Sequence, residues 1–170
     1  MKTDRKYARI FGKEVIVMKS TTLCYIEKDN SYLMIHRVKK KNDENKDKWV
    51  GIGGKLEAGE SPFDCVRREA FEETGLTLTS LRYRGIITFV SDLYGTEYMH
   101  LFSSNAFSGE IKSDCDEGNL EWIKKKELYS LPMWEGDKVF LELLDSEQRF
   151  FSLKLVYEGD RLISHELDFA

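Results

Sequence analysis

Three glutamates, Glu69, Glu72 and Glu73, are spaced so that a helix would bring them onto one face. Residues three and four apart are neighbours on a helix surface, and like charges at that spacing repel each other. A cluster of carboxylates suits a hard divalent cation, because Mg²⁺ prefers carboxylate oxygens and keeps waters that the phosphates of a substrate can replace. The spacing therefore predicts a site for Mg²⁺, with Mn²⁺ as a substitute, that serves phosphate chemistry.

A glycine-rich segment, WVGIGGK, stands just before these glutamates. Its three glycines allow the backbone to approach a ligand closely, and Lys55 adds a compact positive charge that suits phosphate. The segment matches neither GxGxxG nor the Walker A pattern, because Leu56 stands where the first needs Gly and the second needs Ser or Thr. Alone, this segment is weak evidence for nucleotide binding.

The helix that positions the glutamates has clear boundaries. Ser61 is the expected N-cap, Pro62 takes the first helical position, and Asp64 completes a capping box. Gly75 is the expected terminator, so the helix is predicted from about Pro62 to Thr74. An adjacent apolar stripe lets the helix bury one side and show its acidic face at the edge of a cleft. The stripe consists of Phe63, Val66 and Ala70.

The rest of the chain is rich in strand patterns. Residues 21–38 form two β-rich runs around Asp29-Asn30, a pair that tolerates tight-turn geometry, and they predict a hairpin. Further strands are expected at 81–90, at 97–103 and near 120–123, a second helix at 137–145, and a terminal hairpin over 150–169. A strand-rich chain with two distant helices indicates an α+β fold or a mixed-sheet sandwich.

Two segments are open to more than one interpretation. Residues 39–48 contain no apolar side chain, so they are either a solvated loop or a basic rim that attracts an anionic substrate. Residues 1–17 precede Met18 and the first clear strand pattern, and we expect an N-terminal extension that is either disordered or an edge strand. Residues 18–170 are then predicted to form a single domain.

Length and composition narrow the functional classes. The chain has 170 residues, enough for one domain with its own core. Its 26 Lys and Arg against 30 Asp and Glu give a formal net charge of −4, so no domain-wide basic field attracts a long nucleic acid. No apolar run approaches the roughly 20 residues of a membrane span. We expect a cytoplasmic monomer or homodimer that acts on a small molecule, with no membrane or polymeric nucleic acid as partner.

The three cysteines and three histidines suggest no further chemistry. Cys24, Cys65 and Cys115 form no CxxC pair, which fits a reducing compartment and small buried side chains. The histidines are far apart and lack metal-ligand spacing, so ordinary strand histidines are favoured over zinc ligands. They are His36, His100 and His165.

Nine residues of the glycine segment and the helix fit the pattern Gx5Ex7REUxEExGU, in which U is aliphatic, at every position. They are Gly54, Glu60, Arg68, Glu69, Ala70, Glu72, Glu73, Gly75 and Leu76. This is the Nudix box, and the chain resembles the Nudix hydrolases. The resemblance implies an α/β/α sandwich with a mixed sheet, and Mg²⁺-dependent attack of water on a nucleoside diphosphate that is linked to another group.

The resemblance also assigns roles to residues of the box. It implies that Glu69, Glu72 and Glu73 bind Mg²⁺ with the backbone carbonyl of Gly53. Arg68 would act in catalysis by orienting a glutamate through an ion pair, a duty of the kind that tunes metal ligands. The alternative for the whole box is a capped amphipathic helix with an accidental acidic face.

Outside the box the chain is similar to the MutT-type branch, which removes oxidised purine nucleoside triphosphates such as 8-oxo-dGTP from the nucleotide pool. The resemblance implies that Trp134 stacks on the base and that Asp137 reads its edge, with Trp49 and Lys55 also in the substrate site. Its alternative for Trp134 is a packed aromatic. In the animal enzyme an Asn follows the first Trp, whereas Val50 here cannot form hydrogen bonds to the base.

Glu117 lies outside the box, on a predicted loop. The resemblance implies that it either binds a further metal ion or acts as the base on the attacking water, and its alternative is a solvated loop acid. Two other functions stay open for the whole chain. One is Nudix hydrolysis of another substrate, such as an undamaged nucleotide, a nucleotide sugar or an RNA 5′ end, and the other is a non-catalytic nucleotide sensor.

Overall fold

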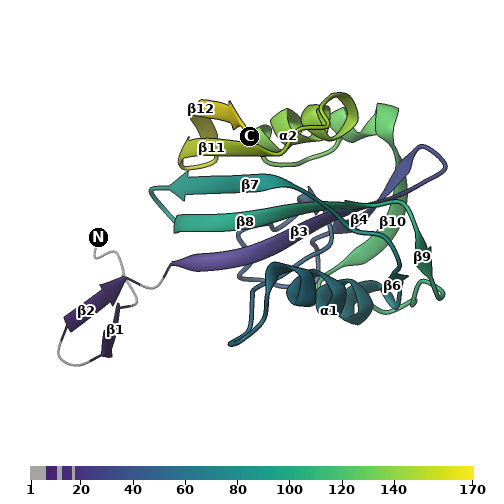
Figure 1. Cartoon of the computed structure of the whole chain (residues 1–170), viewed down its shortest axis with the longest axis horizontal. Coiled ribbons are helices and arrows are strands. Elements are labelled where there is room, and N and C mark those ends of the chain that lie inside the picture. Colours follow the sequence, from purple (N-terminus) through teal and green to yellow (C-terminus); the bar gives the residue numbers. More distant parts are fainter. Residues whose placement is uncertain (1–6, 11–12, 17) are drawn as a thin grey trace.

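A central mixed sheet lies between two helices in the computed structural model, which describes residues 7–10, 13–16 and 18–170. The sheet has the strand order β10-β4-β3-β8-β7-β11-β12, with β5 paired to β4. Helix α1 (Pro62–Thr74) covers one face and helix α2 (Glu135–Ser146) covers the other (Figure 1). The α/β/α sandwich that the resemblance implies is therefore confirmed.

The strands of the sheet lie close to where the sequence predicts them. They are β3 (Lys19–Lys28), β4 (Ser31–His36), β5 (Trp49–Val50), β7 (Arg82–Ser91), β8 (Gly95–Ser104), β10 (Asn119–Lys124), β11 (Phe151–Glu158) and β12 (Arg161–Phe169). β3 pairs with β8 and β7 pairs with β11 in parallel, and the other pairings are antiparallel. The short strands β6 (Thr77–Leu78) and β9 (Phe107–Ser108) pair with each other, and a 3-10 helix, η1 (Lys125–Ser130), follows β10.

The predicted turns and caps have the expected local causes. Asp29 and Asn30 have φ values of 50° and 55°, as a two-residue hairpin turn between β3 and β4 requires. The Ser61 hydroxyl accepts a hydrogen bond from the Asp64 N–H at 3.2 Å, and the Asp64 carboxylate accepts one from the Ser61 N–H at 3.0 Å. Gly75 ends α1 in the left-handed conformation with φ 79°.

Two apolar cores fix the helices to the sheet. Between the sheet and α1 lie Cys24, Ile26, Val66, Ala70 and Phe102, all fully buried. Between the sheet and α2 lie Tyr25, Met34, Leu101, Phe140 and Leu153, of which none is more than 1% exposed. The cysteines Cys24, Cys65 and Cys115 are free and buried, as predicted.

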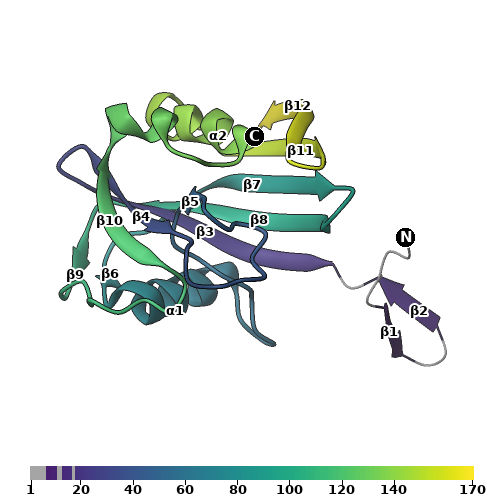
Figure 2. The same cartoon turned by 180° about the vertical axis from the view of Figure 1, so that it is seen from behind.

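Two strands in the N-terminal segment are described. β1 (Tyr7–Ile10) pairs antiparallel with β2 (Lys13–Ile16), and the two form a sheet of their own (Figures 1 and 2). The prediction of disorder or an edge strand for residues 1–17 falls partly on residues 1–6, 11–12 and 17, which lie outside the described residues. The boundary between an extension and a domain over 18–170 stays a prediction.

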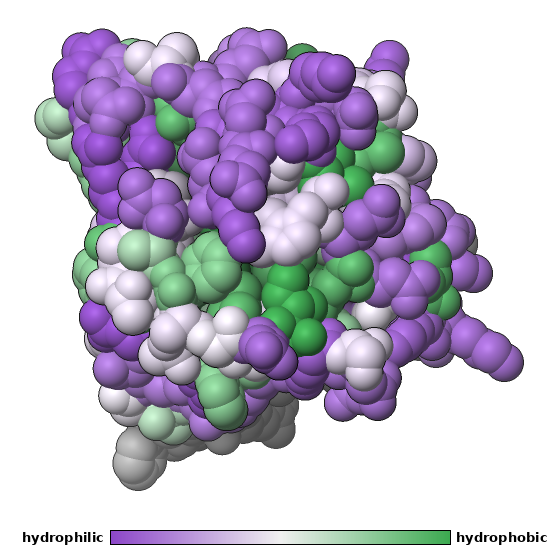
Figure 3. All heavy atoms as spheres, turned by 90° about the vertical axis from the view of Figure 1, so that its right-hand side faces the viewer, coloured by the Kyte–Doolittle hydropathy of each residue, from purple (hydrophilic) through white to green (hydrophobic). Residues whose placement is uncertain are grey.

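One end of the molecule is shown in Figure 3, the side at which the turn between β3 and β4 and strand β9 lie. Apolar residues gather across the middle of this face, with hydrophilic residues around them (Figure 3).

A cavity of about 440 Å³ is lined by Arg82, Arg84 and Lys125 among others, and its lining includes no residue of the Nudix box. None of the described helices is long and apolar enough to cross a membrane.

Candidate active site

The glycine segment docks on the middle of β3 through its backbone. The Thr22 N–H donates to the Gly54 carbonyl at 2.8 Å, and Cys24 and Ile52 exchange hydrogen bonds of 2.6 and 2.9 Å. A Cβ atom at Gly53 would overlap the Thr22 carbonyl, and one at Gly54 would overlap the carboxylate of Glu69. Glycine is therefore required at position 53, where the overlap is with backbone, whereas a side chain at position 54 would displace the Glu69 carboxylate. The close approach brings the segment against α1.

Glu73 is held at this junction. Its side chain lies in the last turn of α1 and is 6% exposed, and its carboxylate accepts a hydrogen bond of 3.0 Å from the Gly53 N–H. Burial raises the pKa of Glu73 to about 8, although the Gly53 N–H lowers it, and the charges of Glu69 and Glu117 raise it further. Three carboxylates thus lie near enough to one another to interact electrostatically.

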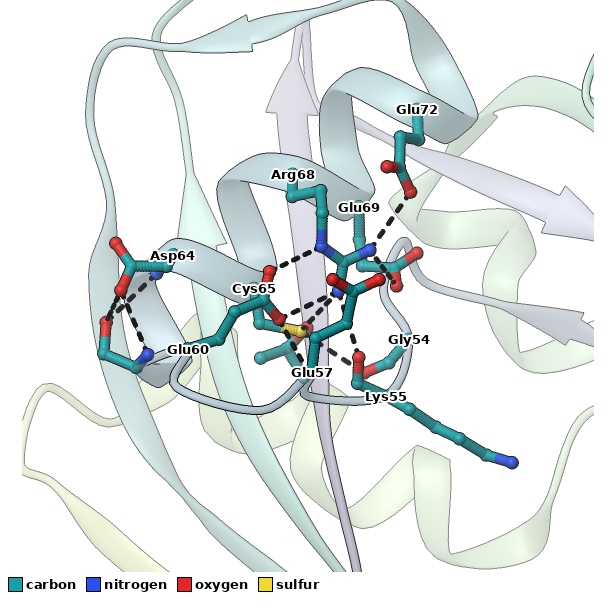
Figure 4. Close-up of polar contacts among 11 residues, drawn as sticks. Gly54, Lys55, Glu57, Glu60, Asp64, Cys65, Arg68, Glu69 and Glu72 are labelled. Carbon is teal, nitrogen blue, oxygen red and sulfur yellow. Dashed lines mark hydrogen bonds and ion pairs between the residues drawn. The ribbon is translucent and has the colours of Figure 1, made fainter.

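Arg68 ties the glycine segment to the acidic face of α1 (Figure 4). Its guanidinium donates to both carboxylate oxygens of Glu60, at 2.6 and 2.9 Å, and to the carboxylates of Glu69 at 2.8 Å and Glu72 at 3.0 Å. A further bond of 3.0 Å goes to the Lys55 carbonyl. Arg68 can therefore orient two of the predicted metal ligands at once, while its role in catalysis stays a prediction.

Glu117 lies in the loop before β10 and forms ion pairs with Arg37 and Lys40. Its charge raises the pKa of both Glu69 and Glu73, after the larger effect of burial on each. The sequence alone leaves open whether Glu117 is a solvated acid. In the structure it pairs with Arg37 and Lys40, and its charge acts on the carboxylates of α1.

The carboxylates fit Mg²⁺ by their donor type. Hard cations prefer oxygen ligands, and a divalent charge would relieve the repulsion that Glu69 and Glu117 exert on buried Glu73. In this structure Arg68, Arg37 and Lys40 neutralise these acids instead. Among residues 18–170, no three acidic, cysteine or histidine side chains lie close enough together to hold one metal ion. Metal binding therefore requires that these side chains move closer together.

Trp134 lies immediately before α2 on the other side of the sheet. It is 6% exposed, and its indole N–H donates to the Asn45 amide oxygen at 2.8 Å. The Lys48 ammonium lies over the ring, 4.3 Å from its centroid. Edge contacts at 5.1 to 6.2 Å between ring centroids come from Phe89, Tyr94 and Tyr157. The indole is thus firmly packed, and Lys48 covers its face.

Asp137 lies in the first turn of α2, beside Trp134. Its N–H donates to the Trp134 carbonyl at 3.0 Å, and the residue is 8% exposed. Burial raises the pKa of the Asp137 carboxyl to about 8, and the nearby charge of Lys48 opposes that rise. A carboxyl in this setting can accept or donate a hydrogen bond near neutral pH, which suits recognition of a base edge.

Trp49 and Lys55 occupy different surroundings. Trp49 stacks on His36 with ring centroids 4.6 Å apart, and the backbone N–H of Trp49 donates to the Pro132 carbonyl at 2.8 Å. Figure 2 shows its strand, β5, beside β4. The Lys55 side chain is exposed and points away from Arg68 and its acids (Figure 4). Trp49 is therefore a structural neighbour of the segment before Trp134, and Lys55 is free to reach a bound anion.

Comparison with known proteins identifies the family of this chain. Residues 18–144 match the family model of the NUDIX domain. The chain belongs to the Nudix hydrolases. An uncharacterised Nudix hydrolase of Bacillus subtilis, YvcI, is 30% identical over 156 residues, which cover 89% of this chain and 95% of that protein. The oxidized purine nucleoside triphosphate hydrolase of Danio rerio is 33% identical over 71% of this chain and 78% of its own length.

A solved structure extends the likeness to three dimensions. A MutT protein from Bacillus halodurans superposes with a TM-score of 0.78 at 32% identity, over 88% of this chain and 97% of that one. This Nudix hydrolase is therefore of the MutT type, and it is a pyrophosphohydrolase. Enzymes of this family act on small nucleotide substrates and generally use divalent cations.

Sequence reasoning did not single out four residues, at 37–48, that contact the predicted site residues of this Nudix hydrolase. Arg37 and Lys40 pair with Glu117, and Asn45 and Lys48 contact Trp134. The segment is thus more than a solvated loop. The available signal was the dense charge of residues 39–48, which is the basis of the basic-rim interpretation.

We predict that Asp137→Asn stabilises this Nudix hydrolase relative to the wild type as the pH rises. The folded pKa of about 8 lies above the ordinary value of 3.8, so between these values the folded protein binds more protons than the unfolded chain. The free energy of unfolding of the wild type therefore falls with rising pH, and Asn removes this loss. The difference in Tm between variant and wild type should grow by at least about 3 °C from pH 5 to pH 9.

Thermal denaturation at several pH values measures this effect, with Asp168→Asn on the exposed edge of β12 as the matched control. The control should change Tm equally at both pH values. A constant difference for Asp137→Asn would show that burial does not hold this carboxyl protonated.

Proposed function

We propose that this Nudix hydrolase converts purine nucleoside triphosphates, above all oxidised ones such as 8-oxo-dGTP, to the nucleoside monophosphate and pyrophosphate in the presence of Mg²⁺. Its role would be sanitation of the nucleotide pool in the cytoplasm. One observation supports this best: a single loop contacts both ends of the candidate site. Arg37 and Lys40 reach Glu117, and Asn45 and Lys48 reach Trp134. The loop thus links the acidic face of α1 to the surroundings of Trp134.

The acidic end of the site would carry the hydrolysis. Glu69, Glu72, Glu73 and the Gly53 carbonyl are the groups that would hold Mg²⁺. When bound, Mg²⁺ neutralises phosphate charge and lowers the pKa of water. Arg68 keeps the carboxylates of Glu69 and Glu72 in fixed orientations through its hydrogen bonds.

Glu117 has two candidate roles in this proposal, as an additional ligand or as the base that takes the proton of the attacking water. Its ion pairs with Arg37 and Lys40 hold it at the edge of the acidic face. The water would attack the α-phosphorus in line, so that a new P–O bond forms while the bond from this phosphorus to the α–β bridging oxygen breaks, and pyrophosphate leaves.

The other end would bind the purine. Stacking on the Trp134 indole is worth roughly 1 to 3 kcal/mol, and Asp137 would read the base edge, with Trp49 beside it and Lys55 on the phosphates. The relatives in Danio rerio and Mus musculus are named as oxidized purine nucleoside triphosphate hydrolases, at 33% and 27% identity, which favours this substrate class.

The test is pyrophosphate release with Mg²⁺ at equal low concentrations of 8-oxo-dGTP and dGTP. We expect kcat/KM to be at least tenfold higher for the oxidised nucleotide, a discrimination of about 1.4 kcal/mol in the transition state. Equal values would contradict the preference for oxidised purines, and inactivity with both would contradict triphosphate hydrolysis.

NAD-capped RNA is the substrate to include beside these nucleotides. A NAD-capped RNA hydrolase, NudC of Vibrio parahaemolyticus, is 30% identical over 72% of this chain, although the match spans only 42% of that protein. Release of the capped end without turnover of 8-oxo-dGTP would favour this second activity. Turnover of 8-oxo-dGTP alone would exclude it.

A further inference from the structure

The loop between β4 and β5 brings two polar side chains to the indole of Trp134. The Asn45 amide oxygen accepts the indole N–H at 2.8 Å, and the Lys48 ammonium lies 4.3 Å from the ring centroid. Both side chains are half-buried. Their chain positions, three residues apart in a charged segment, gave no indication of this shared contact.

The loop is held in place by its own hydrogen bonds. The Arg37 N–H donates to the Lys48 carbonyl at 3.0 Å, and the Asp47 N–H donates to the Arg37 carbonyl at 2.8 Å. The Asp43 carboxylate accepts from the Arg37 guanidinium at 2.7 Å and from the Asn45 N–H at 2.9 Å. Asn45 and Lys48 are therefore presented from a closed turn.

Asn45 and Lys48 both offer hydrogen-bond donors to a ligand. Because the Asn45 oxygen accepts the indole N–H, the amide nitrogen of Asn45 remains as a donor. Lys48 has three donors and no acceptor. Asp137 supplies a carboxyl beside Trp134, and the charge of Lys48 acts on that carboxyl. The surroundings of the indole thus have donors on the loop and, on α2, a carboxyl that can accept or donate a hydrogen bond.

A 6-oxopurine matches this arrangement. Guanine presents acceptors at O6 and N7 and donors at N1 and N2, whereas adenine presents an amino donor at position 6. An 8-oxoguanine keeps the O6 acceptor. Lysine is a typical partner for O6 and N7 of guanine. A 6-amino group would place a donor against the donors of the loop.

We infer that Lys48 and Asn45 are specificity-determining residues that select 6-oxopurine over 6-aminopurine nucleotides, an inference that rests on the proposed function. The base takes the indole face that Lys48 now covers, and the ammonium moves from the ring to the base edge. The flexible four-carbon stem of lysine permits that movement.

Val50 does not supply this selectivity. It is the residue at which the chain departs from the animal enzyme, and its side chain packs in the core between the sheet and α1. Trp134 belongs to the other core, between the sheet and α2. The polar groups that contact the indole therefore come from the loop rather than from the strand that follows it.

The test compares Lys48→Met with the wild type, using GMP and AMP as binding probes and dGTP and dATP as substrates. Methionine keeps an unbranched stem but removes the charge and the donors. We expect the preference for GMP over AMP, and the ratio of kcat/KM for dGTP over dATP, to fall about tenfold. The change should appear in KM and leave kcat for dGTP nearly the same, because the phosphate end is untouched.

Lys46→Met is the matched control, since Lys46 lies in the same loop, is exposed, and has no side-chain hydrogen bond or ion pair with the described residues. Lys46→Met should leave unchanged both the binding preference for GMP over AMP and the ratio of kcat/KM for dGTP over dATP. Lys48→Arg, which keeps the charge and donors, should restore the preference, and Asn45→Ala should lower it. Tm values of all variants check that the Trp134 packing survives.

The outcomes separate this inference from the proposed function. If the wild type hydrolyses neither triphosphate but binds GMP over AMP in a Lys48-dependent way, the proposed function fails and the inference stands. Equal loss for both purines in Lys48→Met, an unchanged ratio, or a wild type without preference would overturn the inference.

Discussion

Replacing Glu73 by Gln should lower kcat by two or more orders of magnitude and leave the protein folded. Gln keeps the shape of the side chain, and its amide oxygen can still accept the Gly53 N–H, which lies 3.0 Å from the carboxylate. The substitution removes a negative charge from the predicted metal ligands, and metal catalysis contributes several kcal/mol to such reactions. The measurement is kcat for 8-oxo-dGTP hydrolysis with saturating Mg²⁺.

Thermal stability distinguishes this loss from unfolding. Because burial raises the pKa of Glu73 to about 8, a neutral amide fits the same site without the cost of a buried charge. Tm should therefore be equal to or above that of the wild type near pH 9. Glu142→Gln, an exposed glutamate on α2, is the matched control and should keep full activity. Near-native turnover in Glu73→Gln would remove Glu73 from the mechanism.

The sequence predicts the local parts of this site well. The helix from Pro62 to Thr74 follows from its capping box and its terminating glycine, and both are present in the structure. The turn at Asp29-Asn30 follows from residue types that tolerate positive φ. Such features depend on neighbours within a few residues, so one sequence contains the whole cause.

Contacts between segments that are distant in the chain could not be predicted from the sequence in the same way. The three glutamates share a helix face by spacing, yet Glu73 is buried and Glu72 is exposed, because the glycine segment covers only one edge of that face. The contacts of Asn45 and Lys48 with Trp134 span more than 80 residues. They depend on how β4, β5 and α2 pack, and a run of charged residues by itself also fits a solvated loop.

Gly53→Ala is expected to cost both stability and activity. The added methyl group would overlap the Thr22 carbonyl, and the segment is fixed there by the hydrogen bond from the Thr22 N–H to Gly54. Overpacking of this kind costs about 1 to 3 kcal/mol of unfolding free energy. To relieve the overlap the segment must leave β3, and the Gly53 N–H then moves away from Glu73.

The effect on kcat should be on the order of 100-fold, since displacements of about 1 Å at a catalytic group have effects of that size. Gly59→Ala is the matched control, because its φ of 85° is strained for Ala but its Cβ would meet no atom within 4 Å. It should lose about 1 kcal/mol and retain kcat. A Gly53→Ala enzyme with lowered Tm and normal kcat would mean that Glu73 functions without the Gly53 hydrogen bond. A loss of both Tm and kcat would show that Gly53 positions Glu73.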